Sequence, residues 1–323
     1  MAKTASDAVI ETRGLRRVFN ARKRVVEAVA GVDLTVAGGE IFGFLGPNGA
    51  GKTTTLRMLA TLLAPSGGTA QIAGYDLLTQ PDKIRQRIGY VGQAGGSDRE
   101  ITGRRELVFQ GRLYGMSRDA ASRRAAELIE MLELAACADR KTGTYSGGQK
   151  RRLDIGLGLV HDPKLLFLDE PTTGLDPQSR ARVWDEVRRM HERGTTVFLT
   201  THYLDEADAL CDRIAIIDYG KIVTAGTPEE LKREVAGDVV TLSVAGDQQR
   251  ALDLLKTQRF VREGRLEEGS VLLYVDRGEV AMPDILRLLD GAGLRLVTIG
   301  LHRPSLDDVF LRQTGRSLRE TAA

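Results

Sequence analysis

The apolar positions in the first 45 residues follow the spacing of β-strands. Val32, Leu34 and Val36 alternate with polar residues ahead of a pair of glycines, which predicts a strand with one buried face. Residues 41–45 are almost continuously apolar, as in a strand that is buried on both faces. We therefore expect an antiparallel β subdomain over residues 9–45 that leads into a buried strand.

The pattern changes to helical spacing between residues 106 and 134, which predicts a helical insertion. Apolar runs typical of strands return at 165–168, 196–200 and 214–217, separated by helical stretches such as 180–191. Runs of this kind suit a parallel sheet that is covered on both faces. The apolar residues of the two helices expected in the insertion are Leu107, Phe109 and Leu113, and Leu128, Ile129 and Leu132.

A second domain is expected after residue 236, so the predicted domains are 1–236 and 237–323. Its elements follow the order strand, helix, strand, strand, helix, strand, which is typical of a small α+β ferredoxin-like domain. A final helix follows Pro304, with Ser305 as its N-cap. The six expected elements lie at 239–244, 248–258, 260–266, 271–275, 279–290 and 294–299.

The composition is that of a globular protein with nearly balanced charge. The 323 residues include 46 Lys and Arg against 44 Asp and Glu, a net charge of +2, so nucleic acid is not an expected partner. Cys137 and Cys211 lie far apart without metal-type spacing, which fits a reducing compartment. No apolar run approaches the roughly 20 residues that cross a bilayer, and the N-terminus lacks the pattern of a signal peptide. We expect a cytoplasmic protein, with any membrane-spanning part on another chain.

The segment between the predicted strand at 41–45 and an apolar helical stretch at 55–63 matches the nucleoside-triphosphate P-loop pattern in full. Glycines let backbone N–H groups turn toward the phosphates, Lys52 can reach the β- and γ-phosphates, and the Thr53 hydroxyl can ligate Mg²⁺. The motif predicts ATP or GTP binding and does not separate transporters, kinases, GTPases and helicases. Its residues are Gly46, Pro47, Asn48, Gly49, Ala50, Gly51, Lys52, Thr53 and Thr54.

The apolar strand at 165–168 ends in two carboxylates, Asp169 and Glu170, which is a Walker B pattern. Neighbouring residues of a strand point to opposite sides, so Asp169 can face the magnesium while Glu170 addresses the attacking water. Positioning that water and neutralising the γ-phosphate supply most of the rate in phosphoryl transfer. The pair therefore predicts hydrolysis of the bound nucleotide.

A second phosphate-binding sequence precedes a helix that carries Leu153, Leu157 and Val160 on one face. A serine and two glycines at a helix start offer a hydroxyl and free N–H groups to an anion. Because the P-loop already holds one nucleotide, a second phosphate site in the same domain implies sharing across a dimer. The residues are Ser146, Gly147, Gly148 and Gln149.

With these motifs in this order, residues 9–235 resemble the ATP-binding subunits of ABC transporters. The resemblance implies ATP and Mg²⁺ as ligands and an α/β ABC ATPase fold with a parallel core, an antiparallel β subdomain and a helical subdomain. It identifies Gln93 as the Q-loop glutamine, which contacts the magnesium or the water and senses the permease. It places Asp176 in the D-loop at the dimer interface, and it makes His202 the switch histidine that holds the γ-phosphate and orients Glu170.

Two residues depart from the family pattern. Phe19, the candidate for stacking on adenine, stands where tyrosine is more common, and Tyr145 replaces the usual leucine before the signature serine. Neither change removes a catalytic group, so an active ATPase is expected. The expected catalytic residues are Lys52, Gln93, Glu170 and His202, and the expected magnesium ligands are Thr53, Gln93 and Asp169.

The P-loop sequence and the segment 304–311 are similar to those of the daunorubicin-resistance type of bacterial drug exporter. This resemblance implies a polytopic permease on another chain, a second ATPase subunit and export of hydrophobic drugs or lipids from the cytoplasmic face of the membrane. Two alternatives are a soluble ABC ATPase that acts on ribosomes or chromosomes and an importer ATPase with a C-terminal barrel. A single P-loop disfavours the first, and the alternation of helices and strands after residue 236 disfavours the second.

Overall fold

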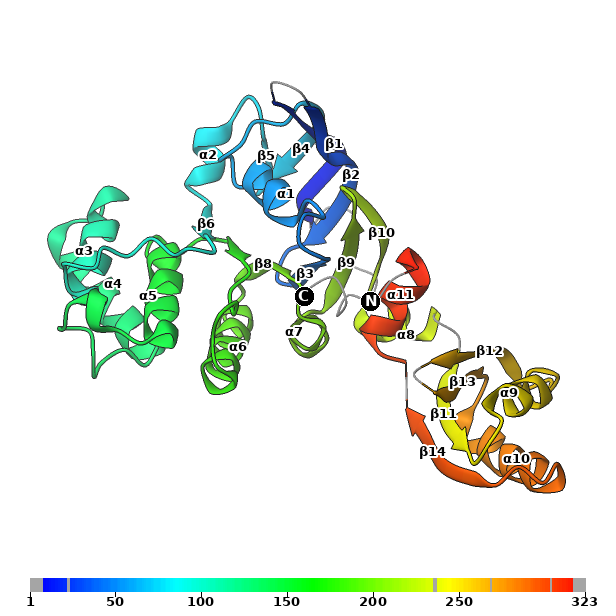
Figure 1. The fold of residues 1–323 in the computed structure, drawn as a ribbon. Coiled ribbons are helices and arrows are strands. Elements are labelled where there is room, and N and C mark those ends of the chain that lie inside the picture. The colour runs from blue at the N-terminus through cyan, green and yellow to red at the C-terminus, as the bar shows by residue number, and fades with distance from the viewer. Residues whose placement is uncertain (1–7, 22–23, 235–236, 268, 303, 316–323) are drawn as a thin grey trace. The chain divides into compact units, whose positions relative to one another are not determined.

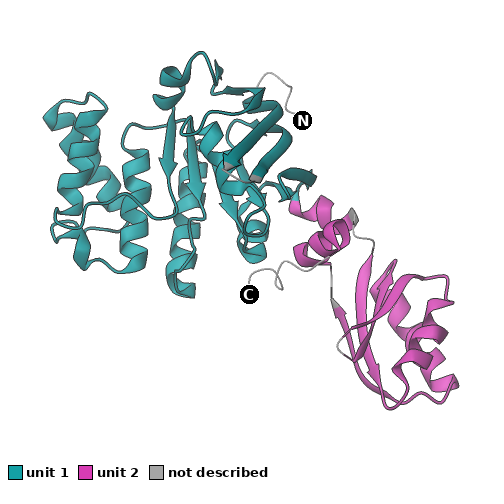
Figure 2. Ribbon diagram, turned by 45° about the horizontal axis from the view of Figure 1, so that its top comes forward, with its two compact units in different colours: residues 1–227, 322 teal, residues 228–321, 323 magenta. Residues whose placement is uncertain are grey.

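The computed structural model describes residues 8–21, 24–234, 237–267, 269–302 and 304–315. The chain forms two compact units, the first extending to residue 227 and the second beginning at residue 228 (Figure 2). The domain boundary expected after residue 236 stays a prediction.

The first unit contains a four-stranded sheet in which every neighbouring pair is antiparallel (Figure 1). Val32, Leu34 and Val36 are buried there, as their alternation predicts. They join the core beneath the sheet together with Ile10 and Ile72. The strands, in the order β2-β1-β4-β5, are β1 (Ala8–Ala21), β2 (Arg24–Ala37), β4 (Gly67–Ile72) and β5 (Tyr75–Asp76).

A six-stranded sheet forms the centre of the first unit. Strands β3, β7 and β8 are buried along their whole length, and the ring of Phe198 packs against Phe42, Phe44 and Phe167. The order is β10-β9-β3-β8-β7-β6, and all pairs are parallel except β9 with β10. The strands are β3 (Ile41–Leu45), β6 (Ile88–Val91), β7 (Leu165–Asp169), β8 (Thr196–Thr201), β9 (Arg213–Asp218) and β10 (Lys221–Gly226).

The antiparallel edge strand β10 is an exception to the parallel sheet that the apolar runs predict. Only Tyr219 and Gly220 join β9 to β10, and both have positive φ, 44° and 76°. Two residues of this conformation form a tight hairpin turn, which cannot connect parallel strands.

Helices α1, α5, α6 and α7 pack against this sheet, and α3 and α4 pack on α5 as the expected helical insertion (Figure 1). Leu107 is buried in α3, but Phe109 and Leu113 are 58% and 65% exposed, so only part of the apolar pattern of this helix reaches the core. The helices are α1 (Lys52–Leu59), α2 (Pro81–Arg85), α3 (Gly103–Leu113), α4 (Arg118–Met131), the 3-10 turn η2 (Thr142–Thr144), α5 (Gly147–Leu159), α6 (Pro177–Glu192) and α7 (Leu204–Leu210).

The second unit has an antiparallel sheet in the order β12-β13-β11-β14, which is the ferredoxin-like order that the sequence predicts. Helices α9 and α10 pack against the sheet, and α8 packs against α11. Ser305 caps α11 in a capping box with Asp308, as expected. The elements are α8 (Pro228–Glu234), β11 (Asp238–Val244), α9 (Gln248–Lys256), β12 (Val261–Glu267), β13 (Ser270–Val275), α10 (Gly278–Gly291), β14 (Leu296–His302) and α11 (Leu306–Thr314).

In the part of the chain that the structure describes, every helix is too short or too polar to span a membrane.

Candidate active site

The P-loop connects the C-terminal end of β3 to the start of α1. Gly46 N donates a hydrogen bond to the carbonyl of Thr201 at the end of β8, which anchors the loop on the central sheet. Gly51 has φ 105°, and a Cβ at this position would lie 2.4 Å from the Ala28 carbonyl oxygen, so only glycine fits. Among the described residues no side chain caps the start of α1. Its first N–H groups are therefore available to a phosphate.

Lys52 places a buried cation under this loop. Its Nζ donates to the carbonyls of Gly46 (2.8 Å) and Pro47 (3.1 Å) and lies 3.3 Å from Glu170 Oε1. Burial lowers the pKa of the Lys52 ammonium, and the negative charge of Glu170 opposes that shift. The Lys52 cation is thus held by two carbonyls of the loop and by Glu170.

Asp169 is fully buried at the end of β7 and has one oxygen unused. Its Oδ1 accepts hydrogen bonds from Thr53 Oγ1 (2.9 Å) and Thr200 Oγ1 (2.8 Å), whereas Oδ2 is buried without a partner among the described residues. A buried carboxylate oxygen beside a hydroxyl suits a hard cation such as Mg²⁺. Asp169 and Thr53 fit the magnesium site that the sequence predicts.

Glu170 is the most heavily contacted carboxylate of the site. Its Oε2 accepts hydrogen bonds from Gln93 Nε2 and Thr173 Oγ1, both at 3.1 Å, and lies 3.4 Å from His202 Nδ1. Burial by itself raises the pKa of Glu170, but the adjoining His202 and the charge of Lys52 outweigh burial and lower that pKa to about 2. Glu170 is therefore ionised at neutral pH and can accept a hydrogen bond from a water.

The backbone of Glu170 is as constrained as its side chain. Its φ of 44° lies in the left-handed region, which is uncommon for a residue other than glycine. The Glu170 N–H donates to both the hydroxyl and the carbonyl of Thr200, at 3.0 and 3.1 Å. Strand β8 thus holds the turn that follows the Walker B strand.

Several of these groups line a cavity of about 490 Å³. The P-loop, Gln93 and Glu170 line it, so the structure brings together segments that lie far apart in the sequence. The other predicted site residues are not among its lining residues, namely Phe19, Gly46, Pro47, Ala50, the signature residues 146–149, Asp169, Asp176 and His202. The lining residues are Ala28, Asn48, Gly49, Gly51, Lys52, Thr53, Thr54, Gln93 and Glu170.

Phe19 lies on β1 and is 38% exposed. The guanidinium of Arg17 sits 4.7 Å above its ring, a cation–π contact that leaves the ring partly open. The role of Phe19 in adenine stacking stays a prediction.

The signature sequence and the D-loop form the adjoining starts of α5 and α6. Ser146 caps α5 in a capping box with Gln149, and Asp176 caps α6 by accepting from the N–H and hydroxyl of Ser179 at 2.9 and 2.7 Å. A Cβ at Gly148 would lie 2.7 Å from Ser179 Oγ, so the two helix starts are in close contact. Their roles in nucleotide binding stay predictions.

Tyr145 has a structural role that explains its departure from the family pattern. Its hydroxyl donates a 2.7 Å hydrogen bond to the carbonyl of Cys137, and burial raises the pKa of the Tyr145 hydroxyl. The phenol therefore ties the signature sequence to the end of the helical insertion.

Sequence reasoning missed the contacts of Thr200 and Thr173. Thr200 bridges Asp169 and the Glu170 N–H, while Thr173 bonds the Glu170 carboxylate. A threonine in a buried strand is common, so only its neighbour across the sheet gives Thr200 a role. The D-loop motif runs from Thr173 to Asp176, and this position is the one available signal for Thr173.

Sequence comparison finds two known domains in the chain. Residues 29–173 match the profile of the family described as ABC transporter, and residues 226–314 match the family described as ATP-binding protein DrrA1-3-like, C-terminal domain. The second match covers most of the described part of the second unit.

Characterised relatives match along almost the whole chain. The chain is 46% identical to the daunorubicin/doxorubicin resistance ATP-binding protein DrrA of Streptomyces peucetius, covering 99% of this chain and 98% of the relative. It is 42% identical to the Nod factor export ATP-binding protein I of Burkholderia lata, covering 90% and 93% of the two chains. A solved dimeric ATP-binding cassette with bound ADP and Pi superposes with a TM-score of 0.63 at 25% identity, covering 68% of this chain and 98% of that cassette.

Proposed function

We propose a function from the family of this chain, which belongs to the ABC transporter ATP-binding proteins of the daunorubicin-resistance type. In this proposal its ATPase activity drives a separate membrane permease in the export of hydrophobic drugs or lipids. The observation that carries the proposal is the contact of Glu170 with Lys52, Gln93 and His202 at the edge of the P-loop cavity. Residues from three separate segments converge on one carboxylate there, an arrangement that suits hydrolysis of a γ-phosphate.

Each group of the site has a proposed role. Lys52 and the N–H groups at the start of α1 bind the phosphates, and Thr53 with Asp169 holds the magnesium that accompanies the nucleotide. Bound there, this ion neutralises the negative charge that develops on the phosphates. Glu170 orients the attacking water, and His202 orients Glu170.

The working form in this proposal is a dimer with two nucleotides, each between the P-loop of one chain and Ser146 of the other. Two observations support it. The helix start at Ser146 leaves the N–H groups of Gly147 and Gly148 outside its capping box, and it does not line the P-loop cavity of its own chain. A dimeric cassette of known structure also superposes on this chain. Closing on ATP and opening after hydrolysis then supply the motion.

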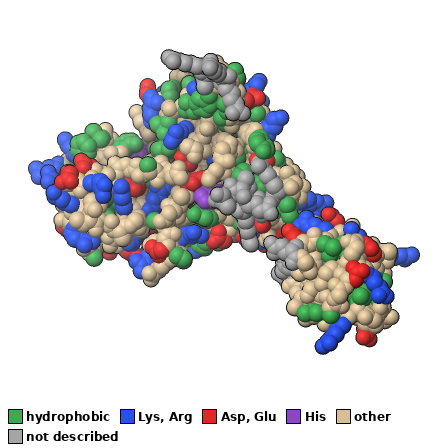
Figure 3. All heavy atoms as spheres, in the orientation of Figure 1, with side chains coloured by type: hydrophobic (Ala, Val, Ile, Leu, Met, Phe, Trp, Pro, Cys, Tyr) green, Lys and Arg blue, Asp and Glu red, His purple; other side chains and the backbone are tan. Residues whose placement is uncertain are grey.

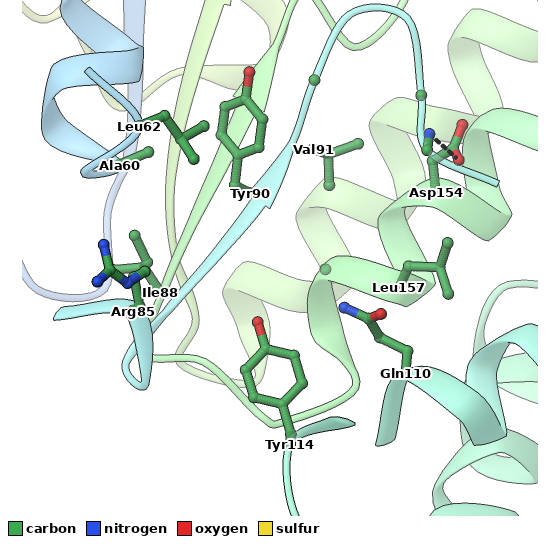
Figure 4. Close-up of a pocket in the computed structure, with 14 residues that line it drawn as sticks. Ala60, Leu62, Arg85, Ile88, Tyr90, Val91, Gln110, Tyr114, Asp154 and Leu157 are labelled. Carbon is green, nitrogen blue, oxygen red and sulfur yellow. Dashed lines mark hydrogen bonds between the residues drawn. The ribbon is translucent and has the colours of Figure 1, made fainter. Parts of the chain in front are cut away.

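The proposed permease contact lies beside the loop of Gln93. A second cavity, of about 400 Å³, lies between this loop and the helical insertion, with Tyr90, Tyr114 and Leu157 in its wall (Figure 4). Phe109 and Leu113 are exposed on α3, the helix that also supplies Gln110 to this wall. Exposed apolar side chains beside a cavity favour a protein partner. Such docking places the chain at the cytoplasmic face of the membrane.

The export direction and the chemistry of the cargo rest on the relatives. Their names refer to daunorubicin, doxorubicin and linearmycin resistance and to Nod factor export. On the face in Figure 3, basic and acidic side chains are interspersed, which does not favour a polyanion such as ribosomal RNA or DNA as the partner. The rival functions on ribosomes, on chromosomes or in import are therefore less well supported.

The test is a mild-detergent pull-down of the tagged full chain from its own cells, carrying Glu170→Gln and supplied with ATP and Mg²⁺. Recovery of a polytopic membrane protein at one-to-one stoichiometry supports the exporter. Recovery of ribosomes or DNA complexes instead contradicts the membrane function and leaves the ATPase chemistry standing.

The second unit is proposed to stabilise the dimer or to bind the permease. The match of residues 226–314 to a domain found with this type of ATPase supports a role specific to it. Truncation after residue 235 tests this role, because unchanged dimerisation together with unchanged membrane association would contradict it.

A further inference from the structure

Arg151 makes three hydrogen bonds from inside the protein to backbone carbonyls at the active site. It lies on α5, two residues past the signature sequence, and is 7% exposed. Nε donates to Pro171 O at 2.7 Å, and one terminal nitrogen donates to Gly92 O, also at 2.7 Å. The other terminal nitrogen donates to Asp169 O at 3.1 Å.

The three carbonyls are the direct neighbours of Gln93 and Glu170. Gly92 precedes Gln93, while Asp169 and Pro171 stand on the two sides of Glu170. The side chains of Gln93 and Glu170 are themselves joined by the 3.1 Å hydrogen bond. One guanidinium therefore fixes the backbone from which both of these side chains extend.

The chemistry of arginine suits this position. Its planar guanidinium donates in fixed directions to several acceptors, whereas a lysine ammonium is a single point charge on a flexible stem. Burial lowers the pKa of the Arg151 guanidinium, and the charges of Asp154 and Asp169 oppose that shift. A buried cation whose partners are lost is costly, so the three carbonyls are held firmly.

Asp154 secures the other end of the same loop. It lies three residues beyond Arg151 on α5, and its Oδ1 accepts from the N–H groups of Gly96 (3.1 Å) and Ser97 (3.2 Å). Figure 4 shows this carboxylate beside the loop that follows Val91. The loop that carries Gln93 is thus held by α5 at both of its ends.

We propose that Arg151 is a positioning residue for ATP hydrolysis, which sets the separation of Gln93 and Glu170 by holding the carbonyls of Gly92, Asp169 and Pro171. It acts through these two residues and does not touch the nucleotide. The inference rests on the proposed roles of Gln93 and Glu170. Because Ser146 caps the start of α5, the same helix joins the signature sequence to the water-positioning carboxylate.

Arg152 offers a matched control on the same helix. It is 5% exposed, donates to the carbonyls of Leu132 and Glu133 at 2.7 and 3.3 Å, and lies 3.7 Å from the Glu133 carboxylate, so its hydrogen bonds go to the helical insertion. Replacing Arg151 or Arg152 by Met removes a buried guanidinium from α5 in both cases. Only the first replacement releases the active-site carbonyls.

The experiment compares the full-length wild type, Arg151→Met, Arg151→Lys and Arg152→Met in kcat, KM and equilibrium ATP affinity, with thermal unfolding as a check on folding. We expect Arg151→Met to lower kcat by about 10²-fold while ATP affinity stays within about twofold, as for a misplaced catalytic group. The kcat of Arg151→Lys should lie between those of Arg151→Met and the wild type, and Arg152→Met should keep the wild-type kcat.

Two results would overturn the inference. One is a wild-type kcat in Arg151→Met, or in Arg151→Lys if the Met variant does not fold. Another is an equal loss of ATP affinity and kcat in both Arg151→Met and Arg152→Met, which would indicate a structural role alone. Absence of ATP hydrolysis by the wild type would instead contradict the proposed function, on which the inference depends.

Discussion

His202 Nδ1 lies 3.4 Å from Glu170 Oε2, the same oxygen that accepts hydrogen bonds from Gln93 and Thr173. Lys52 approaches the other oxygen, Oε1, at 3.3 Å. The two oxygens of this carboxylate therefore face different groups, and its plane is fixed. A water that Glu170 orients would be placed by all four of these neighbours.

Replacement of Glu170 by Gln should leave ATP bound and lower turnover by about 10²-fold or more, because an amide cannot act as the base. Dimers should then accumulate with ATP and be visible by size-exclusion chromatography. Glu186→Gln is the control, since Glu186 is also buried and lies outside the cavity. A rate near that of the wild type would show that Glu170 is not the base.

Replacement of His202 by Ala should reduce ATP turnover and change its pH dependence. The ordinary pKa of a glutamate is about 4.3, and in this site His202 and Lys52 hold the pKa of Glu170 at about 2. Without His202, burial raises that pKa, so Glu170 becomes protonated at a higher pH. The acid limb of the pH–rate profile should move upward in pH, measured as kcat between pH 3 and pH 8. Full activity with an unmoved acid limb would remove His202 from the mechanism.

Gly103→Ala should destabilise the protein through Tyr145. A Cβ at Gly103 would lie 2.5 Å from the Tyr145 hydroxyl oxygen, and this overlap should cost about 1–3 kcal/mol in the free energy of unfolding. Tyr145→Leu alone should cost about 1 kcal/mol, because the Cys137 carbonyl loses one of its two donors and keeps the N–H of Arg140. The double variant should be destabilised by less than the sum of the two single losses, as measured by urea unfolding. Strict additivity would mean that the two residues do not meet.

Glu186→Gln should stabilise the protein above neutral pH. Burial raises the pKa of Glu186 to about 7, against the opposing charge of Arg189, so the folded state holds a proton that the unfolded state has released. The folded protein therefore loses stability as the pH rises from about 4.3 through 7. We expect the substitution to raise the free energy of unfolding by on the order of 1 kcal/mol at pH 8 and to change it little at pH 5. A stabilisation that is equal at both pH values would show that Glu186 does not titrate in this range.

The sequence alone predicts the elements whose signals are local. The P-loop, the Asp169–Glu170 strand end and the ferredoxin-like order follow from motif spacing and from the period of apolar residues. The exposure of Phe109 and Leu113 could not be predicted in this way, because it depends on what packs against α3. The antiparallel strand β10 depends on the conformation of two turn residues.

Within the site, some residues likewise have a local sequence signal and others are identified only by the folded structure. Glu170 and His202 stand at strand ends, where a carboxylate and a histidine indicate a catalytic site, and the structure brings them together. Thr200 and Arg151 act through backbone groups that come close only in the folded sheet, so no spacing along the chain marks them. Such residues appear in a sequence as an ordinary strand threonine and an ordinary helix arginine.

The left-handed backbone of Glu170 has a consequence for protein engineering. Glycine would relax this backbone by about 1 kcal/mol, but it would also leave Lys52 buried without the carboxylate that faces it. The loss of one partner from a buried ion pair costs more than the strain that glycine relieves. A random library screened for heat resistance alone would therefore retain Glu170, although such a screen does not select for turnover.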